Sequence, residues 1–503
     1  MAGFVPLPIG RRIPASPHAV SCSLPTMRDV CGYEERDADV LRHVTSGYPR
    51  FLVHPFAREL AAHLAAADPA LAGRTLWLTS SAAMADRLAA FLAGDGRPAR
   101  FARDGVQGVS HEADARVGDR AKMFLQHVGG FLSSREAEDH LVRLGRRPAP
   151  HAEDAFGGDA LAEIRRCLRP ALTGARDEDL FVANCGMSAI DAGFRAVSAV
   201  QAARGRTACM QIGWLYLDTI AILQKFTAGP ADYVYVRDVS DLAGLTALLA
   251  QVGPRLAGVV AEVQTNPLVQ TPDLPALAAA CRRVGARLLV DPSIASVFSV
   301  DVLPHADVVV SSLTKYTASE GDLTAGLAAV NPAGLDAEAL RAGIAASTEP
   351  LYARDAARLA WQIGRTADVL GLIHASLPQV VAFLGRHPAV RDVFWALQPA
   401  GGDRYRRLAR TPEATGGMVT FTLREPGALA RVYDRLRLPK GPSFGMTTTL
   451  VCPFMYLAHY DLVSTEAGRA RLAADGLDPD LLRLCVGTEP VGDIIGALAD
   501  ALG

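Results

Sequence analysis

Short apolar runs recur along more than half of this 503-residue chain, and they constrain its fold more than any other feature of the sequence. Between residues 58 and 345 the runs alternate with stretches of helical periodicity, as expected when strands buried on both faces alternate with covering helices. This rhythm predicts an α/β domain built on a large, mostly parallel sheet of seven strands. The runs are Thr75–Leu78, Leu180–Ala183, Ala208–Ile212, Tyr233–Val236, Gly258–Val263, Arg287–Val290 and Ala306–Val310.

The segments on either side follow other patterns. The first part of the chain is rich in Pro, His and Arg with little periodicity, which indicates an arm lying over another surface. Near the C-terminus, helical spacing over Ala353–Leu384 leads to strand-like runs at Met418–Leu423 and Leu482–Val486. We therefore expect three units, which are an arm over residues 1–57, the α/β domain over 58–345 and a smaller α+β domain over 346–503.

Charge and composition narrow the range of partners. Lys and Arg total 51 against 53 Asp and Glu, and no long basic block occurs, so we expect no nucleic-acid partner. No apolar stretch reaches the ~18 residues of a membrane span, and the N-terminus lacks the order of a secretory signal. We therefore expect a cytoplasmic protein that does not enter a membrane. The eight cysteines include no Cys-x-x-Cys pair, so neither disulfides nor a metal site are expected.

A lysine follows the last of the apolar runs. The hexapeptide Ser311-Ser312-Leu313-Thr314-Lys315-Tyr316 stands where a core strand ends, and ligands bind at that edge of an open α/β sheet. A lysine desolvated there loses its proton and can condense with an aldehyde, while the neighbouring hydroxyl groups can bind a phosphate. A surface lysine after a strand is the alternative interpretation of the hexapeptide alone.

Other predicted strand ends carry groups that suit the same ligand. Asp291 ends an apolar strand, and a buried carboxylate needs a cationic partner such as a protonated pyridine nitrogen. Gly186 and Met187 open a helix, whose free N–H groups favour a phosphate. Tyr216 can stack on a ring, and Asn266 can bond the ring oxygen. Each motif taken singly is also explained as a turn or a core residue.

Taken in chain order, these motifs resemble the Cys/Met-metabolism family of fold type I pyridoxal-phosphate enzymes, which includes cystathionine γ-synthases and lyases. The resemblance runs from about Tyr48 to Glu489. In the arm and at Lys440-Gly-Pro-Ser443 it is closest to the long, fungal-type cystathionine γ-synthase branch. It implies an aspartate-aminotransferase-like fold. The site residues that it implies are Tyr48, Arg50, Cys185, Gly186, Met187, Tyr216, Asn266, Asp291, Ser312, Thr314, Lys315, Ser443 and Arg483.

The resemblance also implies catalytic roles. Lys315 holds pyridoxal 5′-phosphate as a Schiff base and then moves protons, and Asp291 pairs with the pyridinium. Tyr216 stacks on the ring and can protonate the leaving group. Arg483 binds the substrate's α-carboxylate through a bidentate fork, with Ser443 adjacent.

Phosphate and ring contacts are implied in the same way. Asn266 meets the ring oxygen, and Tyr48 also lies near the substrate. Tyr48 and Arg50 are expected to reach in from a neighbouring subunit, so a homodimer or homotetramer is implied. The phosphate contacts implied are Gly186, Met187, Ser312 and Thr314, with Cys185 at a position where the family often has Ser.

These residues predict γ-replacement on an O-activated homoserine by a thiol such as L-cysteine, the trans-sulfuration reaction of cystathionine γ-synthase. A γ- or β-lyase of sulfur amino acids is one alternative. A biosynthetic enzyme that adds another nucleophile to a vinylglycine-type intermediate is a second, since Thr317–Gly321 departs from the family pattern. A catalytically silent relative is opposed by the retained Lys315, and a nicotinamide enzyme by the lack of a Gly-x-Gly-x-x-Gly turn.

Overall fold

A seven-stranded sheet forms the centre of the computed structural model, which describes residues 3–503. The strand order is β6-β12-β11-β10-β9-β7-β8, and all neighbouring pairs are parallel apart from those of β12, which is antiparallel to both of its neighbours. This confirms the expected large, mostly parallel sheet of fold type I. The strands are β6 (Leu180–Ala183), β7 (Ala208–Ile212), β8 (Tyr233–Val236), β9 (Leu256–Glu262), β10 (Arg287–Asp291), β11 (Val308–Ser312) and β12 (Gly326–Val330).

Helices cover both faces of this sheet because its strands are apolar on both sides. One face packs against α8 (Gly186–Ala202), α9 (Leu217–Phe226) and α12 (Ala337–Ser347). The other packs against α7 (Ala160–Leu168), α10 (Leu242–Val252), α11 (Leu274–Val284) and α13 (Ala353–Ile363). Because the parallel strands run in the same direction, their carboxyl ends lie at one edge of the sheet.

One predicted strand belongs elsewhere. β3 (Thr75–Thr79) pairs with β5 (Val106–His111) in a separate antiparallel sheet, so its expected place in the large sheet is wrong. The apolar run fixed the strand but not its partner, which lies some thirty residues further along the chain. The seventh place is taken by β12, whose small residues Gly326-Leu-Ala-Ala-Val330 gave a weaker signal.

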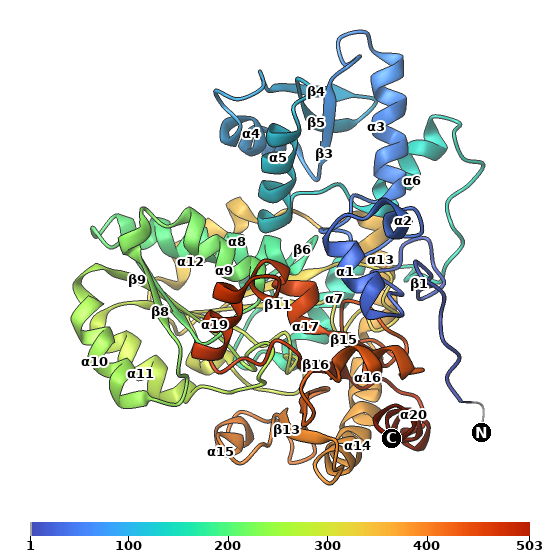
Figure 1. Ribbon diagram of the computed structural model, residues 1–503. Coiled ribbons are helices and arrows are strands. Elements are labelled where there is room, and N and C mark those ends of the chain that lie inside the picture. The colour runs from blue at the N-terminus through green and yellow to red at the C-terminus, as the bar shows by residue number, and fades with distance from the viewer. Residues whose placement is uncertain (1–2) are drawn as a thin grey trace.

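β3 is part of what we call the inserted unit, residues 55–143. Its three-stranded sheet and its helices stand above the large sheet at the top of Figure 1. Separate apolar clusters hold it together. Its elements are α3 (Pro55–Ala67), β3, α4 (Ala82–Phe91), β4 (Ala99–Arg103), β5, α5 (Ala115–Val128) and α6 (Ser134–Arg143).

The C-terminal part contains a four-stranded antiparallel sheet in the order β13-β14-β16-β15. The predicted strands at residues 418–423 and 482–486 are confirmed as β14 and β16. The strands are β13 (Val390–Trp395), β14 (Met418–Leu423), β15 (Leu450–Pro453) and β16 (Leu482–Cys485). The helices are α14 (Thr366–Leu384), α15 (Gly402–Arg406), α16 (Leu429–Arg435), α17 (Phe454–Ala458), α18 (Tyr460–Val463), α19 (Glu466–Ala474) and α20 (Val491–Leu502).

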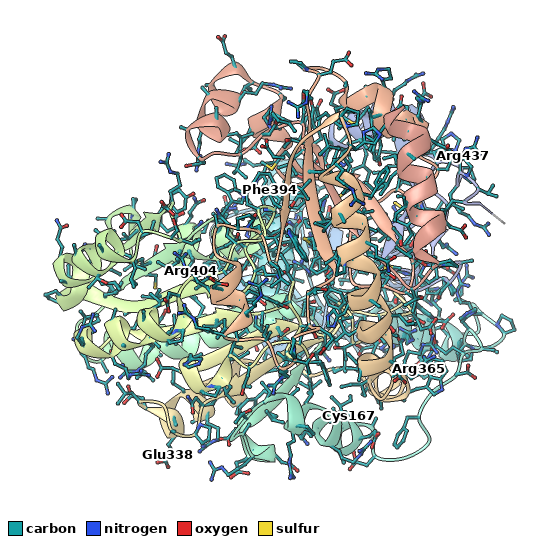
Figure 2. All side chains as sticks on the ribbon, turned by 90° about the horizontal axis from the view of Figure 1, so that it is seen from below. Cys167, Glu338, Arg365, Phe394, Arg404 and Arg437 are labelled. Carbon is teal, nitrogen blue, oxygen red and sulfur yellow. The ribbon has the colours of Figure 1, made fainter. Side chains whose placement is uncertain are left out.

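Helix α14 is the one helix within residues 3–503 that is long and apolar enough to span a membrane. Its buried residues include Leu370, Ile373 and Leu377, and it packs against β14 and α20. Figure 2 shows it beside the strands of the four-stranded sheet, with Arg365 at its start. A core helix of a globular domain meets the same length and composition test.

The arm lies over the C-terminal part of its own chain. The backbone N–H of Leu24 donates to the carbonyl of Lys440 at 3.0 Å, and the Tyr433 hydroxyl donates to the carbonyl of Leu24 at 2.8 Å. Apolar side chains of the arm join the core of the four-stranded sheet. The described arm contains β1 (Arg12–Ile13), β2 (Ser21–Cys22), α1 (Met27–Glu34) and α2 (Ala38–Leu41).

Candidate active site

A cavity of about 490 Å³ opens at the carboxyl edge of the seven-stranded sheet, bordered by the arm, α5 and the C-terminal part. All site residues expected from the sequence line it except Cys185 and Thr314. The strand ends meet here because β6, β9, β10 and β11 run in the same direction.

Lys315 lies in the turn after β11 and is 7% exposed. Burial, together with the cations of Arg483 and Arg50, holds the pKa of its ammonium group well below the ordinary value. Its Nζ donates to the Ser443 hydroxyl at 2.6 Å and lies 4.6 Å from the centre of the Tyr48 ring. The lowered pKa favours the uncharged, nucleophilic form of this amine.

Asp291 is the last residue of β10, and its pKa is raised to about 6 by burial. Ser293 donates to Asp291 Oδ1 through both its hydroxyl group (2.6 Å) and its backbone N–H (2.8 Å). No cation pairs with this carboxylate among residues 3–503, so a protonated ring nitrogen would be its natural partner. The neighbouring Glu262, in register with Asp291 on β9, has its pKa raised well above the ordinary value by burial.

The turn from β6 into α8 provides a place for a phosphate. The N-cap residue Cys185 makes no side-chain hydrogen bond to the first turn of α8, so the N–H groups at Gly186 and Met187 are free of a cap. The buried Ser312 hydroxyl has no hydrogen-bond partner within residues 3–503. A Cβ atom on Gly186 would lie 2.8 Å from the Cβ of Ser312, so only glycine allows this approach.

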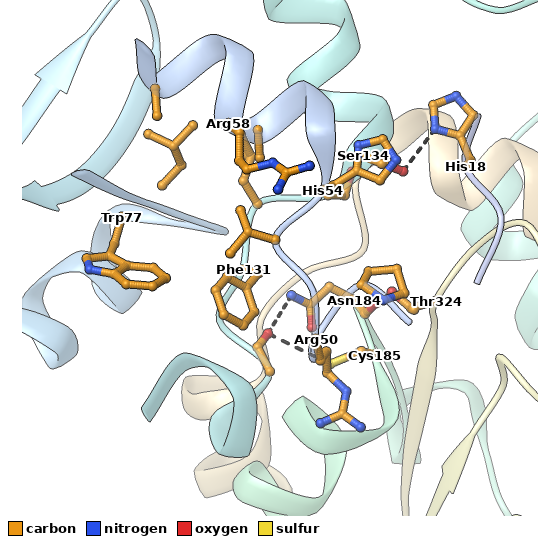
Figure 3. Close-up of a pocket in the computed structure, with 18 of the residues that line it drawn as sticks. His18, Arg50, His54, Arg58, Trp77, Phe131, Ser134, Asn184, Cys185 and Thr324 are labelled. Carbon is orange, nitrogen blue, oxygen red and sulfur yellow. Dashed lines mark hydrogen bonds between the residues drawn. The ribbon is translucent and has the colours of Figure 1, made fainter. Parts of the chain in front are cut away.

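Two expected phosphate contacts differ from the prediction. The Thr314 hydroxyl donates to the carbonyl of Ala325 at 3.3 Å and accepts from its N–H at 3.1 Å, so it holds the residue before β12 and does not line the cavity. The Cys185 thiol lies 3.8 Å from the carbonyl of Gly129 and lines a second cavity of about 240 Å³. Figure 3 shows this second cavity, with Trp77 and Phe131 on one side and Asn184 beside Cys185.

Tyr48 and Arg50 reach the cavity from the arm, and their contribution by a neighbouring subunit stays a prediction. The Arg50 guanidinium donates to Asp218 Oδ2 at 2.6 Å and to the Tyr216 hydroxyl at 2.6 Å. Burial raises the pKa of Tyr216 well above its ordinary value, so this phenol keeps its proton.

Arg483 lies on β16 and is 6% exposed. Its guanidinium donates to Asn266 Oδ1 at 3.4 Å and to the carbonyl of Ser443 at 3.1 Å, and it lies over the Phe454 ring at 4.5 Å. It makes no ion pair with a carboxylate among residues 3–503, so its charge is available for a ligand carboxylate.

Several lining residues were not among those expected. Glu262 could have been found, since it ends a buried strand. Lys122 and Gln126 come from α5 of the inserted unit, which has no local signal. At the mouth, burial raises the pKa of Glu34 to about 7.

These groups fit pyridoxal phosphate. The buried amine of Lys315, the strand-end carboxylate of Asp291 and the unsatisfied Ser312 hydroxyl, which faces the start of α8, match its aldehyde, ring nitrogen and phosphate. A wound sheet with this set of groups at its carboxyl edge defines a pyridoxal-phosphate-dependent enzyme of fold type I. Residues 170–503 match the family described as Cys/Met metabolism PLP-dependent enzyme. The chain belongs to that family.

Individual relatives cover nearly the whole chain. L-2-amino-4-chloropent-4-enoate dechlorinase/desaturase of Streptantibioticus cattleyicolor is 40% identical over 98% of this chain and 97% of its own length. Cystathionine γ-synthase of Neurospora crassa is 25% identical over 99% of this chain and 98% of its own length. The crystal structure of cystathionine γ-synthase from Xanthomonas oryzae in complex with cystathionine shares the fold, with a TM-score of 0.57, 22% identity and coverage of 70% and 90% of the two chains.

Proposed function

We propose that this enzyme eliminates a leaving group from the γ-carbon of an L-2-amino acid, with L-2-amino-4-chloropent-4-enoate as the candidate substrate. The observation that carries this proposal is the set of large apolar side chains that line the cavity with Lys315, among them Phe51, Leu52, Phe444 and Leu457. Such a lining suits an unsaturated halogenated side chain better than a charged one. The 40% identity to the dechlorinase/desaturase over almost the full length supports the same choice.

The residues of the site divide the work of binding and proton transfer. Bound pyridoxal phosphate supplies an electron sink for charge that develops at Cα and Cβ. Arg483 binds the substrate's α-carboxylate, and the short path from Arg483 through Ser443 to Lys315 Nζ brings Cα close to the amine. Lys315 then removes the protons from Cα and from Cβ, a role favoured by burial, which lowers the pKa of its ammonium group.

Elimination from the chlorinated substrate removes one proton and one chloride ion overall. Chloride leaves Cγ with the electron pair of the carbon–chlorine bond, and the proton is taken from an adjacent carbon. The electrons of the broken C–H bond form a new carbon–carbon π bond. The protonated Tyr216 hydroxyl, held by Arg50, is placed to donate a hydrogen bond to a departing anion.

γ-Replacement by a thiol such as L-cysteine on an O-activated homoserine is the second candidate. Lys122 and Glu34, which both line the cavity, favour it. A second amino acid that enters beside them would present a carboxylate to Lys122 and an ammonium group to Glu34. The full-length similarity to the cystathionine γ-synthase of Neurospora crassa supports it as well. A γ- or β-lyase of sulfur amino acids, or the addition of another nucleophile, would use the same central residues.

One assay separates these candidates. Cofactor-loaded protein is incubated with L-2-amino-4-chloropent-4-enoate, and with O-acetyl-, O-succinyl- and O-phosphohomoserine, each with and without L-cysteine. The proposal predicts chloride release equal to product formed, without any need for a thiol, and loss of both in Lys315→Ala. If cystathionine forms from a homoserine ester and no chloride is released from the chlorinated substrate, the proposed elimination is wrong and γ-replacement is the reaction.

We also propose that the enzyme acts in the cytoplasm, in amino-acid biosynthesis, and that it assembles as a homodimer or homotetramer. The family membership supports small amino-acid substrates. Light scattering of the cofactor-loaded protein measures the assembly directly.

A further inference from the structure

Two aromatic rings lie against the guanidinium of Arg483. Its Cζ is 4.5 Å from the centre of the Phe454 ring and 5.4 Å from the centre of the Phe444 ring. Both phenylalanines are buried and line the cavity. A buried guanidinium without a carboxylate partner is costly, and the electron-rich face of an aromatic ring offsets part of that cost. The two rings therefore help to keep this cation in the site before a ligand binds.

The hydrogen bonds of Arg483 leave it able to bind an anion. Its two acceptors, Asn266 Oδ1 and the carbonyl of Ser443, are uncharged. A guanidinium has five N–H donors in a planar fork, and a ring that stacks on its face uses none of them. Rings can therefore hold this side chain without competing with a carboxylate for the N–H groups at its edge.

Each ring is held by contacts of its own. Phe454 meets the His459 ring edge to face at 6.0 Å, and Trp214 Nε1 donates to His459 Nε2 at 3.1 Å. Phe444 meets the Tyr316 ring edge to face at 6.1 Å. Trp214 comes just after β7 and Tyr316 comes just after β11. Both rings are therefore fixed from the carboxyl edge of the large sheet.

Phe444 also borders the reacting amine. Lys315 Nζ lies 4.8 Å from the centre of the Phe444 ring, so one ring lies near both the amine and the guanidinium of Arg483. A substrate amino acid that reacts at the amine and binds Arg483 through its carboxylate places its Cα between these two groups. The direction of the guanidinium then decides where Cα lies relative to Lys315.

We propose that Phe444 and Phe454 are positioning residues for Arg483, and that their rings fix the guanidinium and through it the α-carboxylate and Cα of the substrate. The proposal rests on the carboxylate-binding role of Arg483 in the proposed function. It does not depend on the leaving group, because every candidate reaction begins with an L-2-amino acid.

Two probes without a leaving group test the proposal. L-2-aminopent-4-enoate and but-3-en-1-amine share the amino group and the unsaturated side chain, and only the first carries a carboxylate. Each probe is titrated into cofactor-loaded protein, and binding is followed by the cofactor's absorbance near about 420 nm. The variants are Phe444→Leu, Phe454→Leu and the double variant, since leucine keeps an apolar side chain but has no aromatic face.

We expect each single substitution to weaken binding of the amino acid about fivefold, and the double substitution about 20-fold, with no change for the amine. Unchanged amino-acid affinity in all three variants would overturn the proposal. An equal loss for both probes would also overturn it, because the rings would then act as a wall of the cavity and not through Arg483.

A lack of preference for the amino acid in the unaltered protein would remove the carboxylate role of Arg483, and the proposal with it. Chloride release from L-2-amino-4-chloropent-4-enoate is a separate measurement. The proposed elimination can therefore fail while the positioning role stands, and the two failures are told apart.

The matched control is Phe91→Leu, because Phe91 lies over Arg120 at 5.1 Å and does not line the cavity. It should bind both probes as the unaltered protein does. In an Arg483→Gln background, Phe444→Leu should change the affinity of neither probe. If Phe454→Leu does not fold, Phe444→Leu decides alone. A loss confined to the amino acid supports the proposal, and no loss overturns it.

Discussion

The carboxyl edge of the seven-stranded sheet and the inserted unit serve one cavity in different ways. The edge supplies Lys315, Asp291 and Gly186 directly at the ends of buried strands, where the backbone is fixed by hydrogen bonds to neighbouring strands. The inserted unit supplies Lys122 and Gln126 from one helix, which only tertiary packing brings to the cavity. The difference shows that groups fixed by neighbouring strands carry the chemistry, while the inserted unit contributes side chains to the cavity lining.

The largest effect should come from Lys315, on the sheet edge. Lys315→Ala removes both the cofactor's attachment and the base, so we expect turnover to fall at least about 1000-fold. Steady-state rates and the cofactor's absorbance measure the two losses. The exposed Lys225 provides the control variant Lys225→Ala, which should keep both. Substantial turnover in Lys315→Ala would place the catalytic base elsewhere, for instance in the inserted unit.

Asp291 should show its effect in the unfolding of the apoprotein. Burial raises its pKa from 3.8 to about 6, so ionisation costs the folded state free energy that is absent below about pH 4 and complete above about pH 6. Apo Asp291→Asn should therefore be more stable than the unaltered apoprotein by about 3 kcal/mol above that range, and equal to it in acid.

Urea unfolding of both apoproteins across this pH range measures the difference. Added pyridoxal phosphate should reverse the order, because the pyridinium gives the Asp291 carboxylate a cationic partner. Equal stability of the two apoproteins at about pH 8 would contradict the unpaired state of this carboxylate.

Arg483 should matter for substrate binding more than for the cofactor. Arg483→Lys keeps the charge but loses the bidentate fork, so we expect kcat/KM to fall about 30-fold with unchanged cofactor absorbance. Arg437, exposed at the periphery in Figure 2, gives the control Arg437→Lys. A loss of cofactor binding in Arg483→Lys would assign Arg483 to the cofactor instead of the substrate.

The smallest effect should come from Glu34, which lines the cavity together with Lys122 of the inserted unit. Burial raises the pKa of Glu34 to about 7, so the pH profile of kcat/KM should contain a titration there that Glu34→Gln removes, with a rate change of only about threefold. Glu35→Gln, at the exposed neighbouring position, is the control. An unchanged pH profile in Glu34→Gln would mean that the ionisation of Glu34 does not affect substrate binding or turnover.

The sheet edge could be predicted because its signals are local. Lys315 follows one buried strand and Asp291 ends another, so a few consecutive residues predict both where the reactive group lies and which group it is. The misplaced contacts depended on side-chain direction. Thr314 follows the same strand as Lys315, but its hydroxyl group bonds to Ala325, and no local sequence pattern predicts the direction of this side chain.

The strand pairing of the inserted unit could not be predicted, because it depends on contacts between distant parts of the chain. The run Thr75–Leu78 predicted a strand, but its pairing with β5 is fixed by the packing of this unit. Gln126 meets Asp218 across 92 residues of sequence. Contacts at that separation are set by the whole fold, so the spacing of residues along the sequence does not predict them.

The central claim is that the amine at the sheet edge, Lys315, carries the cofactor. The chain contains only four lysines, at positions 122, 225, 315 and 440, and Lys122 also lines the cavity. Borohydride reduction of the cofactor-loaded protein, followed by peptide mapping by mass spectrometry, identifies the lysine that is modified. The account predicts one phosphopyridoxyl group per chain, on Lys315. Modification of Lys122 in its place, or of no lysine, would contradict it.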